Sequence, residues 1–502
     1  MKHSSDKIAF GDFQTPHELA QKCCQVAAQQ FGLVDVVIEP TCGHGTFVTA
    51  AASTFPGSQI VGYEINDLYR QRARRAVNKE TTAKATTSIR KQDFFAADWQ
   101  RNRDQHDGSV LFLGNPPWVT NSQLGVLENK NLPTKSNVES IRGIDAMTGR
   151  SNFDISESIL QTLLTVMRPG QDHLAMLVKT ATARKVLRMQ WQSGAAFSHA
   201  SLRSIDAKKH FDVNVDACLL MLSPGKPQRS KVHVCHQSTS VDKKPTAIAM
   251  GWHDGQLVAN PNDARATDFL FRANAMAWRS GVKHDVSRVL ELREIDGQLF
   301  RQDGEPVEIE RDQVYPLAKG ADVANNRTKC PERRLLVTQH CMSESTAQLQ
   351  GRLPATDRYL QQNREAFDNR KSSIYRNRDP FALFGIGEYT FAPWKVAICG
   401  LYKRLQFTLL GPIKGRAVVV DDTSYTLGFQ TKRQAKLVHE LLTSAEATSF
   451  FQARIFWDAK RPINAQTLRS LDLESLAKHL GRTRQWEEVF PRPTEQGLAL
   501  VD

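Results

Sequence analysis

The sequence predicts an α/β protein whose N-terminal part is a doubly wound, mostly parallel sheet. Short apolar runs of strand length occupy residues 34–38, 59–63 and 110–113, and longer amphipathic stretches separate them. The spacing between the runs suits the right-handed crossovers that join parallel strands. Each run also ends directly in a polar or glycine-containing turn. A sheet of this kind carries helices on both faces and binds its ligand beyond the carboxyl ends of its strands.

The individual elements follow from the same periodicity. Apolar side chains recur on one side of residues 17–31 and predict a helix. A glycine turn separates the first strand from a helix at residues 47–52, and a basic helix begins near Asp67 after the second strand. A capped helix begins near Asp154, whose side chain we expect to be structural. The remaining expected strands of this part are residues 87–91, 174–178 and 215–222.

Charge is unevenly distributed over the 502 residues. The net charge is +13, and residues 311–490 contain 28 Lys and Arg against 18 Asp and Glu. A basic half indicates a polyanionic partner. The alternative is a basic surface that only contacts solvent, which would give the same excess of Lys and Arg. No stretch approaches the length of apolar residues that spans a membrane, and residues 1–11 lack the pattern of a secretory signal, so we expect no membrane association.

Cysteine usage indicates a reducing compartment. The eight cysteines are scattered and form no C-x-x-C pair, which is typical of free thiols and predicts a cytoplasmic protein. His233, Cys235 and His236 lie close together, but alternation across residues 231–236 predicts an ordinary strand there. Since no second ligand pair accompanies them, we expect no metal site.

Polar residues follow four of the expected strands, one for each strand: Glu39, Glu64, Asp93 and Asn115. A glycine turn followed by an acid resembles the dinucleotide-binding pattern, but Val48 stands where the third glycine is required. The excess of acids disfavours a pyrophosphate and favours a cationic nucleoside such as S-adenosylmethionine, with Glu64 on the ribose and Glu39 near the amino-acid group. The alternative is that these acids only cap the helices that follow them.

The segment Asn115-Pro116-Pro117-Trp118 follows the strand at residues 110–113. The prolines fix the backbone and offer carbonyls without competing N–H donors. Asn115 adds a side-chain acceptor, and Trp118 adds a flat apolar face. Such a corner can hold a planar exocyclic amino group by hydrogen bonds while stacking its ring.

In order and spacing, these segments resemble the gamma-class N6-adenine DNA methyltransferases over about residues 8–225. Phe13-Gln14-Thr15-Pro16 looks like the cofactor-lid motif of that family, and residues 39–45 are similar to its glycine motif. Residues 115–118 match its catalytic tetrapeptide, although Tyr or Phe is more usual than Trp at the last position. The resemblance implies S-adenosyl-L-methionine as the cofactor, held by Thr15, Pro16, Glu39, Pro40, Cys42, Gly43, Glu64, Asp93, Phe94 and Asn115.

The resemblance also implies a mechanism. The Asn115 side chain and the Pro116 carbonyl accept both N6 protons, so the nitrogen lone pair leaves the ring and attacks the sulfonium methyl; positioning supplies most of the catalysis. The target base must leave the duplex stack, and an aromatic clamp offsets that cost. Trp118 is one face of this clamp, and Phe211, which precedes the strand at 215–222, is the expected other face. The alternative for Phe211 is an ordinary core residue.

The resemblance further predicts a Rossmann-like class I methyltransferase sheet followed by a mixed α/β target-recognition domain. We expect a catalytic domain at residues 1–225, a connector with β hairpins at 226–310, and a basic DNA-recognition domain at 311–502. Asp296-Gly297 and Asp303-Gly304 predict hairpin turns in the connector. Residues 280–285 look like a segment of restriction-system methyltransferases, without a mechanism attached. The candidate DNA contacts are Lys135, Arg364, Arg370, Lys371 and Arg376, several of them interleaved with aromatic residues.

Three functions remain open from the sequence. The first is an adenine N6 methyltransferase of duplex DNA in a restriction or defence system, acting beside a separate nuclease or another subunit. The second keeps the chemistry but changes the substrate to RNA, to a protein glutamine, or to cytosine N4. The third is a non-catalytic DNA-binding component that keeps the fold.

Overall fold

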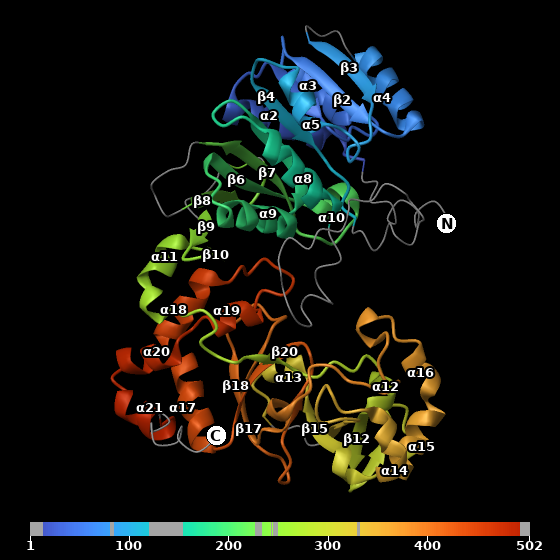
Figure 1. Cartoon of the computed structure of the whole chain (residues 1–502), viewed down its shortest axis with the longest axis vertical. Coiled ribbons are helices and arrows are strands. Elements are labelled where there is room, and N and C mark those ends of the chain that lie inside the picture. Colours follow the sequence, from blue (N-terminus) through green and yellow to red (C-terminus); the bar gives the residue numbers. More distant parts are fainter. Residues whose placement is uncertain are drawn as a thin grey trace, which may run out of the picture. The chain divides into compact units, whose positions relative to one another are not determined.

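The computed structural model describes residues 14–80, 85–119, 154–225, 233–241, 243, 249–328 and 332–491. The chain forms two compact units, residues 1–261 and 262–502, and each unit is described by itself (Figure 1). Within the described residues, no helix combines the length and the apolar character needed to cross a membrane.

The first unit is built on one ten-stranded sheet in the order β10-β9-β8-β6-β7-β5-β4-β1-β2-β3. Strands β3, β2, β1, β4 and β5 are parallel to one another, and β7 runs antiparallel between β5 and β6. The strands are β1 (Val36–Glu39), β2 (Gln59–Glu64), β3 (Thr86–Lys91), β4 (Val110–Gly114), β5 (His173–Lys179), β6 (Phe197–Ile205), β7 (Ala217–Pro224), β8 (His233–Ser238), β9 (Ala249–His253) and β10 (Gln256–Val258).

Helices cover this sheet in two groups, as the alternation of strands and helices predicts. Helix α2 packs beside α3 and α3 beside α4, while α5 packs beside α8 and α8 beside α9 (Figure 1). Leu111 and Leu113 of β4 face the core formed with α2 and α3, so Val110 and Phe112 point to the opposite face. The helices are α2 (His17–Phe31), α3 (Thr46–Thr54), α4 (Asp67–Glu80), α5 (Trp99–Asp104), α8 (Ile155–Val166), α9 (Thr180–Gln192) and α10 (Ala207–Phe211).

The first unit extends beyond the boundary that we expected after residue 225. Strand β8 pairs in parallel with β6, β9 pairs antiparallel with β8, and β10 pairs antiparallel with β9. The break in composition after Pro224 marks a connection between two strands of one sheet, and the chain divides after Pro261 instead. The edge of the ten-stranded sheet therefore uses residues that we expected to form a connector.

The second unit contains two sheets. A four-stranded antiparallel sheet, β11-β20-β17-β18, packs with α17, α18 and α20 in one core. A six-stranded sheet, β14-β13-β12-β16-β15-β19, forms a second core. The strands are β11 (Arg279–Ser280), β12 (Glu291–Ile295), β13 (Gln298–Phe300), β14 (Pro306–Val307), β15 (Val314–Ala318), β16 (Arg333–Leu336), β17 (Trp394–Cys399), β18 (Phe407–Leu410), β19 (Val419–Val420) and β20 (Ser424–Phe429).

The helices of the second unit are mostly short. Both predicted Asp-Gly turns form hairpins, between β12 and β13 and between β13 and β14. The helices are α11 (Pro261–Ala266), which begins at the division between the units, α12 (Ser287–Leu290), α13 (Gly320–Ala324), α14 (Leu349–Arg352), α15 (Pro354–Gln362), α16 (Arg364–Asp368), α17 (Lys432–Leu442), α18 (Ala445–Arg454), α19 (Ala465–Arg469), α20 (Leu473–His479) and α21 (Thr483–Val489).

Candidate active site

Four parallel strands end at one edge of the first sheet. β1 ends at Glu39 and β2 at Glu64, while Asn115 follows β4 directly and Asp93 lies two residues after the end of β3. The register pairs Glu39 with Gly62, which brings the carboxyl ends of β1 and β2 side by side. The four residues that the sequence analysis selected therefore share the edge where open α/β sheets bind ligands.

A glycine turn joins β1 to α3 and places backbone N–H groups against Glu64. The Gly43 N–H donates to Glu64 Oε2 at 2.8 Å, and the Asn66 N–H donates to Oε1 at 2.7 Å. Gly43 and Gly45 have φ angles of +51° and +83°, which favour glycine. A Cβ at Gly45 would also lie 2.9 Å from the Cβ of Ala73, so this glycine allows α3 to approach α4. The glycine turn thus fixes Oε2 of the carboxylate, and Asn66, in the turn between β2 and α4, fixes Oε1.

Glu39 is a buried acid next to a second acid. Its side chain is buried, and its Oε2 has no hydrogen-bond partner within the part of the chain that the structure describes. Burial raises the pKa of Glu39, a backbone hydrogen bond from Val48 opposes the rise, and the charge of Glu64 adds to it. A Cβ at Gly114, whose φ is +154°, would lie 3.1 Å from Glu39 Cγ. A cation placed here would favour the carboxylate form, so the residues fit the positively charged part of S-adenosylmethionine.

Asp93 and Phe94 follow β3. Asp93 is half-buried, and its Oδ1 accepts a hydrogen bond from the Phe95 N–H at 3.0 Å. Phe94 is buried, with its ring centroid 4.8 Å from that of Trp99. Trp99 Nε1 also donates to the Phe94 carbonyl at 2.9 Å. These two contacts with Trp99 therefore fix the position of Phe94.

The tetrapeptide is held at both of its ends. Asn115 Nδ2 donates to Thr15 Oγ1 at 3.1 Å, which ties the motif to the residues that precede α2. Trp118 is buried, and its Nε1 donates to the Leu177 carbonyl at 3.1 Å. Its ring meets that of Phe211 edge to face, with centroids 5.1 Å apart and an interplanar angle of 68°. The two aromatic residues that we expected to act together are thus in contact.

Lys179, at the end of β5, is a residue of this site that the sequence analysis missed. Its Nζ donates to the Trp118 carbonyl at 2.9 Å and to Asp154 Oδ2 at 2.8 Å. Asp154 also caps α8 by accepting from the Ser156 N–H at 3.1 Å, which agrees with the structural role expected for it. The ammonium group therefore joins the end of the tetrapeptide to β5 and to the start of α8.

A buried ion pair lies at the opposite ends of the same strands. Arg103 Nε donates to Asp172 Oδ2 at 2.6 Å, and both side chains are fully buried. Asp172 Oδ1 also accepts from the Val110 N–H at 3.2 Å. This pair, which the sequence analysis did not select, fixes where β4 begins beside β5.

The candidate DNA contacts in the second unit differ from one another. Lys371 and Arg376 are exposed, and Arg364 forms an ion pair with Asp368 at 3.0 Å. Arg370 is instead turned inward: its guanidinium donates to the carbonyls of Phe367, Pro380 and Ala382 and lies 3.6 Å from the centroid of the Tyr375 ring. Burial lowers its pKa. Lys135 lies outside the described residues.

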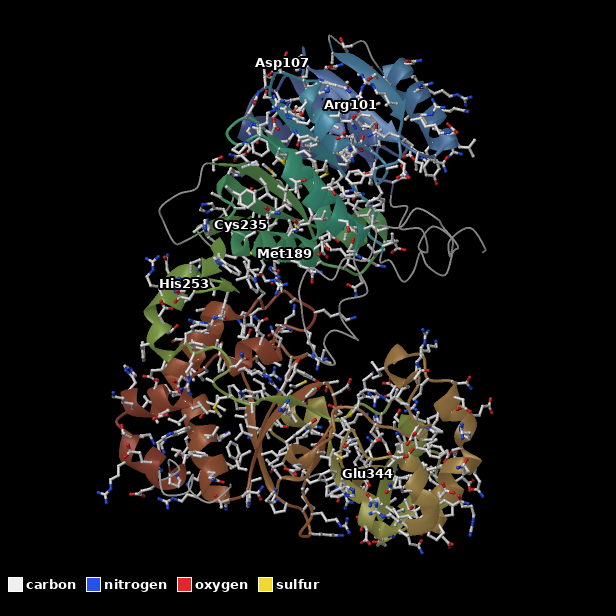
Figure 2. The ribbon with its side chains drawn as sticks, in the orientation of Figure 1. Arg101, Asp107, Met189, Cys235, His253 and Glu344 are labelled. Carbon is white, nitrogen blue, oxygen red and sulfur yellow. The ribbon has the colours of Figure 1, made fainter. Side chains whose placement is uncertain are left out.

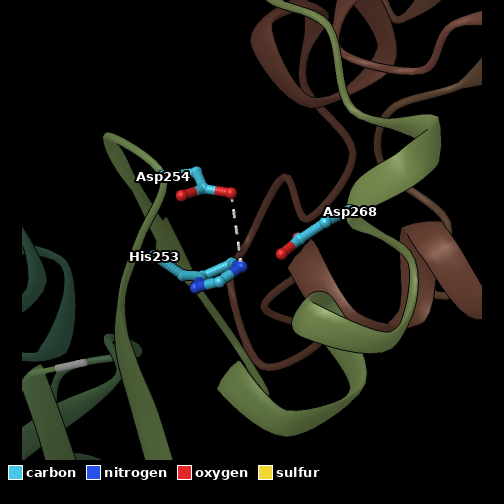
Figure 3. A group of neighbouring side chains, drawn as sticks. All are labelled: His253, Asp254 and Asp268. Carbon is cyan, nitrogen blue, oxygen red and sulfur yellow. Dashed lines mark ion pairs between the residues drawn. The ribbon is translucent and has the colours of Figure 1, made fainter. Parts of the chain in front are cut away.

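Two histidines outside this edge lie on the strands β8 and β9. Cys235, labelled in Figure 2, is fully buried on β8, and His236 on the same strand is exposed, as the predicted alternation requires. His253 ends β9, and its Nε2 lies 3.5 Å from the carboxylate of Asp254 in the turn to β10 (Figure 3). This ion pair joins neighbouring residues of one hairpin.

Comparison with known proteins agrees with the fold. No protein-family model matches the sequence. The chain is 39% identical over 477 residues to the Type II methyltransferase M.NspV of Nostoc sp.. The alignment covers 94% of this chain and 98% of the relative. It also resembles the structure of the Type IIL restriction-modification enzyme MmeI in complex with DNA, at a TM-score of 0.52 and 13% identity, over 96% of this chain and 67% of that one.

The sheet order and the strand-end site define a class I S-adenosylmethionine-dependent methyltransferase. The chain belongs to the family of Type II methyltransferases, the modification enzymes of restriction-modification systems, and S-adenosylmethionine is its cofactor.

Proposed function

We propose that this protein transfers a methyl group from S-adenosylmethionine to the N6 atom of adenine in duplex DNA. The observation that carries the proposal is the position of Asn115, which Thr15 holds at the strand edge that also bears Glu39 and Glu64. An amide oxygen followed by a proline carbonyl offers two acceptors to one amino group. We infer that a separate nuclease acts as the restriction partner, and that the protein works in the cytoplasm.

The cofactor, when bound, supplies an electrophilic methyl group on a sulfonium. Glu39 faces its cationic amino-acid part, with Pro40, Cys42 and Gly43 forming the turn beside it. Glu64 accepts from the ribose hydroxyls with the remaining lone pairs of oxygens that Gly43 and Asn66 already orient. Asp93 accepts from the amino group of the cofactor's adenine, and Phe94 packs against its ring. Thr15 and Pro16 cover the site from the N-terminal side.

The target base is activated by hydrogen bonding. The Asn115 side-chain oxygen and the Pro116 carbonyl accept the two N6 protons, and Pro117 keeps the backbone rigid. The nitrogen then becomes tetrahedral, and its lone pair attacks the methyl carbon in line. As the nitrogen–carbon bond forms, the methyl–sulfur bond breaks to leave a neutral thioether, and the extra N6 proton passes to water. Because the groups are placed before the base arrives, catalysis comes mainly from positioning.

Trp118 and Phe211 hold the flipped base in this proposal. Their rings are 5.1 Å apart and inclined at 68°, whereas a base stacked between two parallel rings needs roughly 7 Å between their centroids. The Trp118 ring is fixed by the Leu177 carbonyl, and Phe211 is only partly buried. Phe211 is therefore the ring that turns when the base enters.

The test is a methylation assay on mixed-sequence duplex DNA, with nucleosides identified by mass spectrometry. We expect N6-methyladenine from the wild type and none from Asn115→Ala, although that variant still binds the cofactor in calorimetry. Asn78→Ala, at an exposed position on α4, is the matched control and should methylate normally. N4-methylcytosine would change the target base, and methyl transfer only to RNA or protein would refute the proposed substrate. A wild type that binds DNA but never the cofactor would refute the catalytic proposal.

A further inference from the structure

The second unit contains a pocket of about 330 Å³ beside the six-stranded sheet. It lies between the β12–β13 hairpin, the start of β15, the strand β16 and the turn at residues 413–416. Four cationic side chains line it: Arg311, Arg334, Lys414 and Arg416. The lining contains one carboxylate, Glu294.

Glu294 is already matched by one of these cations. Arg334 Nε donates to Glu294 Oε2 at 2.6 Å, and Lys414 Nζ lies 3.6 Å from Oε1. Burial opposes ionisation, but the hydrogen bond from Arg334 and the charges of Arg334 and Lys414 outweigh it and lower the pKa of Glu294. The carboxylate therefore neutralises Arg334, and the pocket keeps the charges of the other three cations.

The arginines of the pocket are held in place by backbone carbonyls. Arg311 Nη2 donates to the Gly297 carbonyl, and Arg416 Nη1 donates to the carbonyls of Asp312 and Val314 at 3.0 and 3.3 Å. A guanidinium has five N–H donors, so these bonds orient each group and leave donors for a ligand. The carboxylate of Asp312 lies 3.6 Å from Arg416, but its side chain is 87% exposed and points to solvent.

Two tight turns present these groups. Asp296 and Gly297 have φ angles of +49° and +81°, and Lys414 and Gly415 have +48° and +77°, the signature of two-residue hairpin turns. In the second turn, the Ile413 and Arg416 backbones exchange hydrogen bonds at 2.9 and 3.0 Å. Asn or Asp is the favoured residue at the position of Lys414, because a lysine is strained in the left-handed region. The conformation of the turn therefore does not explain why a lysine occupies position 414.

We propose that this pocket binds a phosphate group, with Arg311, Lys414 and Arg416 as its ligands. Two guanidinium forks and an ammonium match the geometry and charge of a phosphate, and fixed groups lose little entropy when they bind it. The phosphate has two possible sources: the backbone of the DNA substrate or a free phosphorylated small molecule. The first source rests on the proposed function, and the second does not.

Two variants of the full-length protein test the pocket. Lys414→Asn removes a charge and puts a favoured residue into the turn, so it should fold at least as well as the wild type. Arg311→Gln removes a second charge at an exposed position. Arg484→Gln is the matched control, because Arg484 is 95% exposed on α21 and is not part of the lining.

The first measurement is the affinity for mixed-sequence duplex DNA over a range of salt concentrations. If the pocket takes a backbone phosphate, each pocket variant lowers the slope of log Kd against log salt by up to about 0.9, and the control keeps the wild-type slope. The second measurement is the thermal shift caused by inorganic phosphate and by adenosine monophosphate. In one outcome, phosphate raises the melting temperature of the wild type and the control but not of the two pocket variants, and the salt dependence of DNA binding is the same in all four proteins. This outcome assigns the pocket to a free phosphorylated ligand.

Pocket variants that match the control in both measurements overturn the proposal. A wild type that binds no DNA would refute the proposed function instead, and the phosphate titration alone would then decide whether the pocket binds phosphate.

Discussion

Lys395 should make the stability of the second unit depend on pH above neutrality. It lies on β17 between Leu410 of β18 and Gly428 of β20, and its side chain is 1% exposed. Its Nζ donates to the Ala392 carbonyl at 2.6 Å. Burial lowers the pKa of Lys395 from 10.5 to about 7.

The sign of the effect follows from proton binding. Between pH 7 and 10.5 the unfolded chain keeps the Lys395 proton while the folded chain releases it, so the free energy of unfolding rises with pH in this window. Each pH unit corresponds to about 1.4 kcal/mol, which gives an upper limit of about 5 kcal/mol across the window. Below pH 7 the folded state therefore carries a buried charge that Lys395→Met removes.

The assay is urea unfolding of the wild type and Lys395→Met at pH 6, 8 and 10, with hydrogen exchange of the β17 amides as a local readout. We expect the variant to be more stable at pH 6 by up to about 5 kcal/mol, with an advantage that shrinks towards pH 10. Lys478→Met, at an exposed position on α20, is the comparison. A stability difference that stays constant from pH 6 to 10, or a variant that is less stable at pH 6, would refute this reasoning.

Three further predictions concern the first unit. Arg103→Met leaves the buried Asp172 carboxylate unpaired and should lower the free energy of unfolding by about 3–5 kcal/mol in urea; an unchanged midpoint would contradict this. Lys179→Met should lower kcat by up to about 100-fold with little change in cofactor affinity, whereas Lys185→Met, which removes an ion pair on α9, should keep normal kcat. Equal losses in both lysine variants would indicate a merely structural role. Because burial raises the pKa of Glu39 and a cationic ligand favours its carboxylate, cofactor affinity should rise with pH above 4.5; Glu39→Gln should abolish this dependence in calorimetry.

The strand-end residues could be found from the sequence because each one lies at the end of its own strand or within two residues after it. Glu39, Glu64, Asp93 and Asn115 need only the positions of four strands and the rule that parallel strands end at one edge. The bonds that fix the site could not be found in this way. Lys179 and Asp154 are 25 positions apart, and Arg103 and Asp172 are 69 apart, so neither pair leaves a local pattern.

The boundary between the two units was also hard to predict, because it depends on strand pairing between distant segments. The segments that form β8, β9 and β10 alternate as connector hairpins also do, and only the parallel pairing of β8 with β6 assigns them to the sheet of the first unit. The segment at 280–285 had no mechanism in the sequence. In the structure, a Cβ at Gly281 would overlap the carbonyls of Val420 and Asp421, so glycine is required where this segment passes the end of β19.

The two missed ion pairs act on the same pair of strands and from opposite ends. Asp172 accepts the Val110 N–H and fixes the start of β4 against β5, while Lys179, at the far end of β5, holds the Trp118 carbonyl just beyond β4. The register between these strands therefore cannot slip without breaking a buried hydrogen bond at one end or an ammonium contact at the other. Asn115 lies between the two fixed points, so this loop residue keeps the positional accuracy that the proposed in-line methyl transfer requires.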